Sequence, residues 1–136
     1  MQGYIHKVNY YETDKMGIVH HSNYIRFMEE ARLNYLEKLG YPLSHLEAEG
    51  VTSPVVSVSC EYKYPTTYND KIEVEVDIEE YTGVKLMLSY IMKNAESGKI
   101  VAVASSTHCF INDGGIPIAV KKYFPDLDEI LKQQIG

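Results

Sequence analysis

Hydrophobic residues recur at helical spacing in the first third of the chain and alternate strictly with polar residues further on. From Tyr24 to Leu39 they repeat about every 3.6 residues, which predicts one amphipathic helix with a single buried face. The apolar face comprises Tyr24, Ile25, Phe27, Met28, Ala31, Tyr35, Leu36 and Leu39, while Arg26, Glu30 and Glu37 lie opposite. Candidate residues for capping and ending this helix are Ser22, Asn23, Gly40 and Pro42.

Beyond residue 54 the alternation is typical of strands with one face buried and one face in water. The first run places Val56, Val58, Cys60, Tyr62 and Tyr64 on one face. The second places Ile72, Val74, Val76 and Ile78 opposite Glu73, Glu75, Asp77 and Glu79. Turn signals at residues 82–83 and 96–98 separate two more strands, expected over 84–94 and 99–112. A short strand is expected over 4–10, and a short amphipathic helix over 125–135.

This order places a strand and one long helix before four consecutive strands joined by short connections. A parallel crossover needs a dozen or more residues, so short connections predict antiparallel neighbours. The expected fold class is α+β, with an antiparallel sheet wrapped around one long central helix. No repeat or linker divides the sequence, so residues 1–136 are expected to form a single domain. The outer edges of such a sheet favour pairing with a second subunit.

Composition narrows the classes of function. The chain has 136 residues, 45% hydrophobic and 24% charged, as expected for a globular protein. Its formal net charge of -6 argues against nucleic acid or an anionic membrane surface as the main partner. Neither a signal peptide nor a membrane span is indicated, so a cytoplasmic protein is expected. Cys60 and Cys109 match no metal or disulfide pattern and are expected to be buried, reduced thiols.

The densest group of polar residues lies between the first strand and the long helix, over residues 10–24. A helix N-terminus presents unpaired backbone N–H groups and a partial positive charge, and can therefore stabilise an oxyanion. A carboxylate beside it, here Asp14, completes the parts needed for acyl transfer. Gly17 would allow the backbone to approach a bound substrate closely.

Structural roles remain open for the same residues. Asp14 can equally well cap a turn. His20 and His21 are adjacent and lack an obvious third ligand, so no metal site is predicted. Glu29 and Arg32 are expected to form an i,i+3 pair that satisfies a partly buried arginine. The chain has no G-x-S-x-G motif and no glycine-rich phosphate loop, and neither cysteine lies near the segment of His20 and His21 in sequence.

At residues 10–32 the sequence resembles the 4-hydroxybenzoyl-CoA thioesterase family, and more closely its branch associated with the bacterial Tol–Pal system. The resemblance rests on a long pattern, Tyr10-Tyr11-Glu12-Thr13-Asp14-x-x-Gly17-x-Val19-x-His21-x-x-Tyr24, followed by Glu29, Ala31 and Arg32. The turn from Pro65 to Asp70 also looks like one in that family. The sequence departs from the pattern by having one residue fewer between Glu12 and Thr13.

This resemblance implies a hotdog fold and an acyl-CoA thioesterase. Asp14 would be the catalytic carboxylate, acting either as a nucleophile or as a general base on water. The backbone N–H of His21 would polarise the thioester carbonyl, and Tyr10 would be the aromatic residue near the carboxylate. Coenzyme A would be part of the substrate, so no separate cofactor is expected. The family also implies a homodimer or homotetramer with the site at the subunit interface.

Two departures affect the expected acyl group. Lys15 and Met16 replace small residues, and His20 stands where many relatives have tyrosine. One alternative is a hotdog acyl-CoA hydratase or dehydratase, although the D-x-N-P-x-H pattern of such enzymes is absent. The other is a non-catalytic acyl-CoA-binding module, in which loss of the catalytic carboxylate would be expected.

Overall fold

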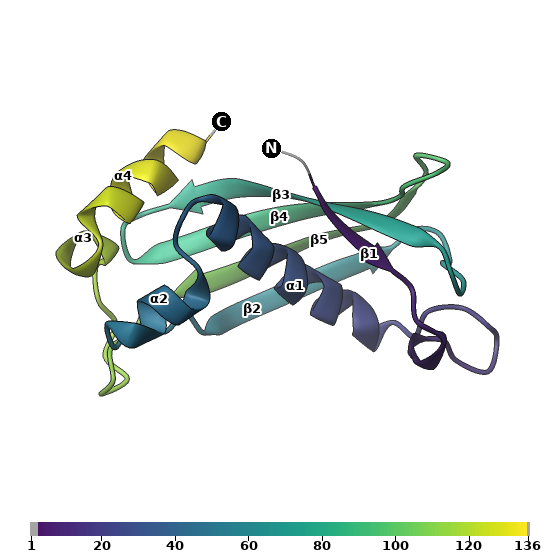
Figure 1. Ribbon diagram of the computed structural model, residues 1–136, viewed down its shortest axis with the longest axis horizontal. Helices are drawn as coiled ribbons and strands as arrows, with labels where there is room; N and C mark the ends of the chain where they lie inside the picture. The colour runs from purple at the N-terminus through teal and green to yellow at the C-terminus, as the bar shows by residue number, and fades with distance from the viewer. Residues whose placement is uncertain (1–2, 136) are drawn as a thin grey trace.

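The computed structural model describes residues 3–135. Within this range, an antiparallel sheet has the strand order β1-β3-β4-β5-β2 (Figure 1). The strands are β1 (Tyr4–Lys7), β2 (Val55–Tyr62), β3 (Lys71–Tyr81), β4 (Lys85–Asn94) and β5 (Ile100–Cys109). The helices are α1 (Ser22–Lys38), α2 (Leu43–Ala48), α3 (Val120–Tyr123) and α4 (Pro125–Gln134). The predicted α+β class, with an antiparallel sheet around one long helix, is confirmed.

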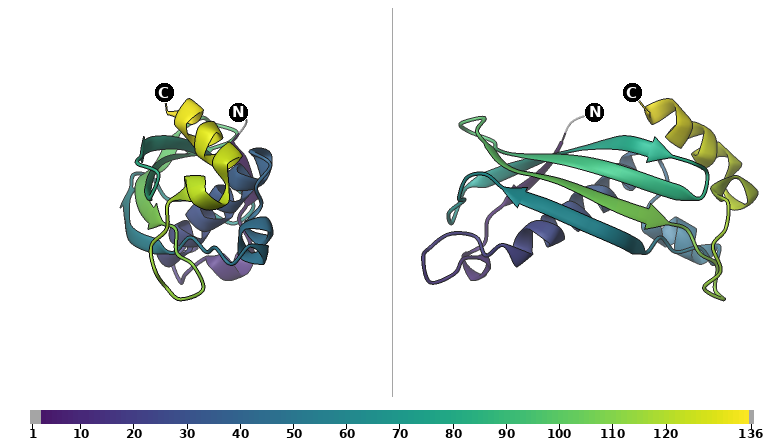
Figure 2. Two further views of the ribbon diagram at one scale, coloured as in Figure 1. Left: turned by 90° about the vertical axis from the view of Figure 1, so that its left-hand side faces the viewer. Right: turned by 180° about the vertical axis from the view of Figure 1, so that it is seen from behind.

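Helix α1 lies in the curve of the sheet, and the opposite face of the sheet carries no helix among the described residues (Figure 2). Most of its predicted apolar face is buried, including Phe27, Met28 and Ala31. Leu39 is half-buried, and Ile25 is exposed over 42% of its surface. Each fully buried large apolar side chain contributes about 1.5–3 kcal/mol. The contact between this face and the sheet is therefore the main source of stability for α1.

Strand β3 behaves as its alternation predicts. Ile72, Val74 and Ile78 are buried, and Val76 is half-buried. Strand β2 does not, since Val56 and Val58 are both exposed although they were expected to face the core. These side chains are exposed because β2 stands at the edge of the sheet, where among the described residues it pairs only with β5.

The connection between β2 and β3 also differs from expectation. These strands follow one another in sequence but stand in different parts of the sheet, so their short connection does not make them neighbours. Residues 63–70 instead cross the end of the sheet, held by backbone hydrogen bonds from Val8 to Asp70 (2.9 Å) and from Val19 to Thr66 (2.8 Å). This crossing brings the end of β2 beside the segment that precedes α1.

Several boundaries are shifted. The first strand ends at Lys7 rather than at residue 10, and a 3-10 helix occupies Tyr10–Glu12. Helix α1 begins at Ser22, with His21 as its N-cap. Both cysteines are free and half-buried rather than fully buried, and burial raises the pKa of the Cys60 thiol. None of the helices within residues 3–135 has both the length and the apolar character needed to cross a membrane.

Candidate active site

A tight loop over residues 13–19 carries Asp14. Its ends meet in a bridge between Thr13 and Val19, and the Asp14 N–H donates to the Ile18 carbonyl at 2.8 Å. Gly17 closes the turn by donating its N–H to the Asp14 carbonyl at 3.0 Å. Its φ of 80° lies in the left-handed region that favours glycine. The loop is therefore a defined hairpin.

The Asp14 carboxylate is half-buried and held from one side. Its Oδ1 accepts the N–H of Met16 at 2.8 Å, the side-chain turn that an aspartate in a loop commonly forms. Its Oδ2 makes no hydrogen bond with another residue in the range 3–135. The turn thus fixes one carboxylate oxygen and leaves the other available to a substrate.

The start of α1 lies next to this loop. The ring of His20 accepts the Ser22 N–H through Nδ1 at 3.2 Å and packs against the His21 ring, with centroids 4.2 Å apart. The His21 carbonyl accepts a hydrogen bond from the Tyr62 hydroxyl at 3.1 Å. The His21 N–H donates to no acceptor among residues 3–135. It is one of the unpaired donors expected at a helix N-terminus.

Asp14 and His21 line one cleft of about 420 Å³, which we call the active-site cleft. Tyr24 of α1 and Tyr62 at the end of β2 contribute to its wall, and their rings pack edge to face at 5.2 Å. Further lining residues come from the crossing segment: Lys63, Tyr64 and Pro65. The cleft therefore combines a carboxylate, a helix N-terminus and an aromatic wall.

Asp14 also lines a second, more polar hollow of about 540 Å³, together with His20 and Arg26. Tyr10 lines neither this hollow nor the active-site cleft. Its side chain is 77% exposed, and its ring packs edge to face against Tyr68 at 5.7 Å. The fold thus brings Asp14 and His21 together within one chain but leaves Tyr10 outside their cleft.

A buried network holds the loop and the helix start in place. The Glu12 carboxylate lies 2.9 Å from the His6 ring and accepts the Asn9 N–H at 2.7 Å. The Glu12 carbonyl accepts the His20 N–H and the Asn23 amide, each at 2.9 Å. Glu12 therefore connects the segment before Asp14 to the first turn of α1.

The predicted pairing of Glu29 with Arg32 does not form as a salt bridge, since no ion pair between them lies within 4.0 Å. Glu29 is exposed whereas Arg32 is buried, which separates the two charges. Burial lowers the pKa of Arg32 from its ordinary value, against smaller opposing effects of Tyr90 and Glu29. As for metals, no cluster of three or more His, Cys, Asp or Glu side chains suited to an ion occurs within residues 3–135.

Sequence reasoning missed Tyr62, Tyr64 and Pro65 as lining residues of the cleft. Tyr62 and Tyr64 were expected to point into the core, as members of an alternating strand. Both are exposed, because β2 is an edge strand and residue 64 lies beyond its end. Their aromatic character at the end of the strand is the available signal, but the same alternation is also typical of core residues.

Comparison with known proteins places this chain in a family. Residues 8–133 match the model of the thioesterase-like superfamily. The Bacillus subtilis protein YneP is 40% identical over 121 residues, covering 88% of this chain and 87% of the relative. The acyl-CoA thioester hydrolase YbgC of Escherichia coli O157:H7 is 32% identical over 91 residues, covering 67% of this chain and 68% of the relative.

A solved structure of a DHNA-CoA thioesterase from Staphylococcus aureus is 32% identical to this chain. It superposes with a TM-score of 0.93 and covers 97% of this chain and 89% of the other. The family match spans most of the sequence, and the strand order and central helix agree with it. The chain belongs to the thioesterase-like superfamily and has the hotdog fold.

Proposed function

We propose that this protein is an acyl-CoA thioesterase, which hydrolyses acyl-CoA to the free acid and coenzyme A. The observation that carries this proposal is the shared cleft of Asp14 and His21. It provides a carboxylate for attack or proton transfer and a helix N-terminus for the developing oxyanion. The printed functions of the YbgC relative and of the Staphylococcus aureus structure support the same reaction class.

Asp14 acts in one of two ways on the thioester. As a nucleophile, its Oδ2 attacks the carbonyl carbon, the C–S bond breaks, and the acyl group remains on Asp14 as an anhydride that water then hydrolyses. As a general base, it takes a proton from the water that attacks the same carbon. Both routes release the coenzyme A thiol and restore the carboxylate. The His21 N–H donates to the carbonyl oxygen as negative charge develops there.

The site is completed by a second copy of the chain. Strand β2 pairs on one side with β5, which leaves a free edge that carries exposed Val55, Val56 and Val58. Exposed, apolar edge strands favour pairing with another chain. Because Tyr62 ends this strand and lines the cleft, a dimer formed along β2 places the partner next to the substrate. The oligomer is therefore part of the proposed enzyme.

Three finer assignments stay predictions. Membership of the 4-hydroxybenzoyl-CoA thioesterase family, in its Tol–Pal-associated branch, rests on the motif around Asp14. A contact between Tyr10 and the acyl group requires Tyr10 to reach the cleft, from the partner or by a movement of its exposed side chain. A cytoplasmic location is the third.

The test is a panel of acyl-CoA esters assayed by release of free thiol, with wild type, Asp14→Asn and Asp113→Asn. Asp113 is a matched control, because it is an exposed loop aspartate outside the cleft. We expect Asp14→Asn to reduce kcat by about 10²-fold or more, as on removal of a base or nucleophile. The Asp113→Asn variant is expected to keep wild-type turnover.

Unchanged turnover in Asp14→Asn would contradict the role of Asp14. Tight binding of acyl-CoA by the wild-type protein without turnover would instead favour a non-catalytic binding module. Addition of water to an enoyl-CoA without release of thiol would favour the hydratase alternative.

A further inference from the structure

Arg32 is a buried cation without a partner among residues 3–135. Its side chain lies in the middle of α1 and is 6% exposed. Within residues 3–135 it forms no ion pair and donates no hydrogen bond. A buried charge that lacks hydrogen-bond acceptors is costly. Its donors are therefore available to an acceptor from outside the described chain.

Arg32 lines a small cavity of about 110 Å³ between α1 and the β2 side of the sheet, which we call the polar pocket. Its other buried polar lining residues are Tyr90, Ser106 and His108. Its apolar lining residues are Ile25, Met28, Val55 and Val58. A cavity needs roughly 10–15 Å³ to hold one water molecule. The polar pocket therefore admits a group of several non-hydrogen atoms.

The polar residues opposite Arg32 form a hydrogen-bonded row. The Tyr90 hydroxyl lies 2.6 Å from the Ser106 hydroxyl, which in turn lies 2.7 Å from Nε2 of His108. His108 is 1% exposed, and its Nδ1 has no hydrogen-bond partner among residues 3–135. Burial first, and then the charge of Arg32, lower the pKa of His108 to about 4, against an opposing effect of the Pro54 carbonyl. The row is therefore uncharged at neutral pH.

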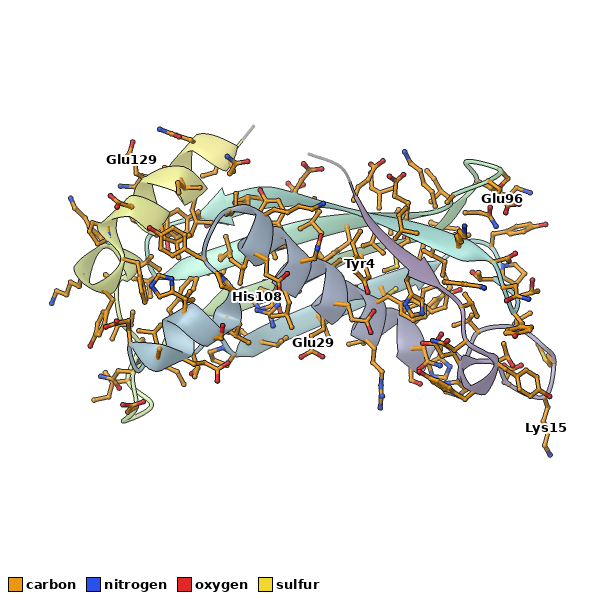
Figure 3. All side chains as sticks on the ribbon, viewed as in Figure 1. Tyr4, Lys15, Glu29, Glu96, His108 and Glu129 are labelled. Atoms are coloured by element: carbon orange, nitrogen blue, oxygen red, sulfur yellow. The ribbon has the colours of Figure 1, made fainter. Side chains whose placement is uncertain are left out.

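The charge balance around the polar pocket is simple. Arg32 supplies the buried positive charge and His108 is neutral. Glu29, labelled with His108 in Figure 3, is an exposed carboxylate among the lining residues. An oxygen atom entering the pocket can accept from the Arg32 guanidinium. A hydroxyl group can also donate a hydrogen bond, whereas a carboxylate adds attraction to Arg32 and repulsion from Glu29. The hydroxyl and the carboxylate both contain an oxygen that can accept a hydrogen bond from Arg32.

The polar pocket and the active-site cleft lie along the same α1–β2 seam. Ile25 of the pocket is one helical turn from His21 of the cleft. Val58 of the pocket precedes Tyr62 of the cleft by four residues on β2, which is roughly 13 Å of strand. An acyl group with its thioester at Asp14 can therefore extend along the seam toward Arg32.

We propose that the polar pocket is a subsite for the far end of the acyl group, and that it selects acyl-CoA esters whose distal end carries an oxygen, as a hydroxyl or a carboxylate. This inference rests on the proposed thioesterase function. Arg32 donates to the distal oxygen, and the Ser106 hydroxyl offers a second polar contact. The apolar lining residues hold the carbon chain between the two sites.

The test compares acyl-CoA, ω-hydroxyacyl-CoA and ω-carboxyacyl-CoA of equal chain length, over a series of lengths, by kcat/KM from thiol release. We expect one or both oxygenated series to exceed the plain series by about tenfold at the length that reaches the polar pocket. The ratio between the hydroxyl and carboxyl arms identifies which oxygen group the site takes.

Two variants locate this preference. Arg32→Met and Ser106→Ala are expected to bring the ratio of oxygenated to plain substrate close to one. Ser105→Ala is the matched control on β5, because Ser105 bonds to Ser59 at 2.8 Å and does not line the pocket. It is expected to keep the wild-type ratio. If Arg32→Met does not fold, the ratio of oxygenated to plain substrate measured for Ser106→Ala still tests the subsite.

A ratio of one or less at every chain length would overturn the subsite, as would a preference that survives in both variants. Hydrolysis of plain esters without any such preference leaves the proposed function standing and removes only the subsite. Absence of hydrolysis in every series contradicts the thioesterase function, and the subsite falls with it.

Discussion

The Tyr81 hydroxyl donates a hydrogen bond of 2.5 Å to the Asp128 carboxylate, both of them buried. Tyr81 ends β3 and Asp128 lies in the first turn of α4, so this contact ties the C-terminal helix to the sheet. Lys132 pairs with the same carboxylate at 2.9 Å, one turn further along the helix. The hydrogen bond from Tyr81, with help from Lys132 and against burial, holds the pKa of Asp128 below its ordinary value of 3.8.

Tyr81→Phe is expected to lower the free energy of unfolding at pH 7 by about 1–3 kcal/mol, because a buried carboxylate loses a donor. A carboxyl group with a lowered pKa in the folded state adds stability above its unfolded pKa, and this stability is lost as pH falls through the folded value. The difference between wild type and variant should therefore be largest above pH 3.8 and shrink in acid. Urea unfolding over a range of pH measures it.

The matched control for this variant is Tyr123→Phe, at an exposed position in α3. It is expected to change stability by less than about 0.5 kcal/mol. Equal stability of Tyr81→Phe and wild type at pH 7 would show that the contact with Asp128 adds nothing.

Glu12→Gln is expected to reduce kcat by about tenfold, because it removes the carboxylate charge beside the His6 ring (2.9 Å) and loosens the segment whose Glu12 carbonyl holds the start of α1. It acts through position and does not line the active-site cleft. A glutamine oxygen can still accept the Asn9 N–H, so we expect most of the protein to remain folded. Measuring kcat together with thermal unfolding separates a loss of activity in the folded protein from a loss of folded protein.

Glu79→Gln on the exposed face of β3 controls for the loss of one negative charge. A Glu12→Gln variant with wild-type kcat would contradict the positioning role. A variant with full loss of folded structure calls for Asn23→Ala, which removes one hydrogen bond to the Glu12 carbonyl.

The fold was largely predictable because two of its patterns are local. The period of α1 and the strict alternation of Ile72, Val74 and Ile78 mark buried faces, and these faces are buried. The place of β2 was not predictable in this way, because Val56 and Val58 alternate as core residues do. Whether such residues face a core or a partner depends on strand order, which is a long-range property.

Part of the site was predictable because it also depends on a local pattern. Asp14 and His21 lie in one short segment, and the helix start between the histidines and Tyr24 gives them a common location. The contribution of Tyr62 depends on the crossing of residues 63–70, which sequence periodicity does not encode. That Arg32 has no partner among the described residues was not predictable either, because an i,i+3 spacing permits a pair with Glu29 without requiring it.

His108→Gln is expected to flatten the dependence of stability on pH between 6.5 and about 4. In this interval the unfolded chain binds a proton at His108 whereas the folded chain does not, so stability falls as pH falls. Since each pKa unit is worth about 1.4 kcal/mol, the wild-type loss from this residue is roughly 3 kcal/mol. Unfolding by urea at several pH values between 7 and 4 measures it.

His45→Gln is the control, because His45 is exposed on α2 and outside the polar pocket. Its curve should keep the wild-type slope, since His108 is still present. A His108→Gln curve with the wild-type slope would show that His108 takes up its proton equally in both states.

Val56→Lys is expected to break the proposed dimer along β2. Val56 is 62% exposed on the edge strand, and a lysine there opposes pairing with a second copy, as charges do on natural edge strands. Light scattering after size exclusion should show a smaller species than wild type, and kcat/KM should fall because the partner borders the cleft. Val84→Lys makes the same change at an exposed position just before β4, away from the free edge, and should keep the wild-type size and rate. A Val56→Lys protein of wild-type size would place the interface elsewhere, and one that is smaller yet fully active would show that a single chain holds the complete site.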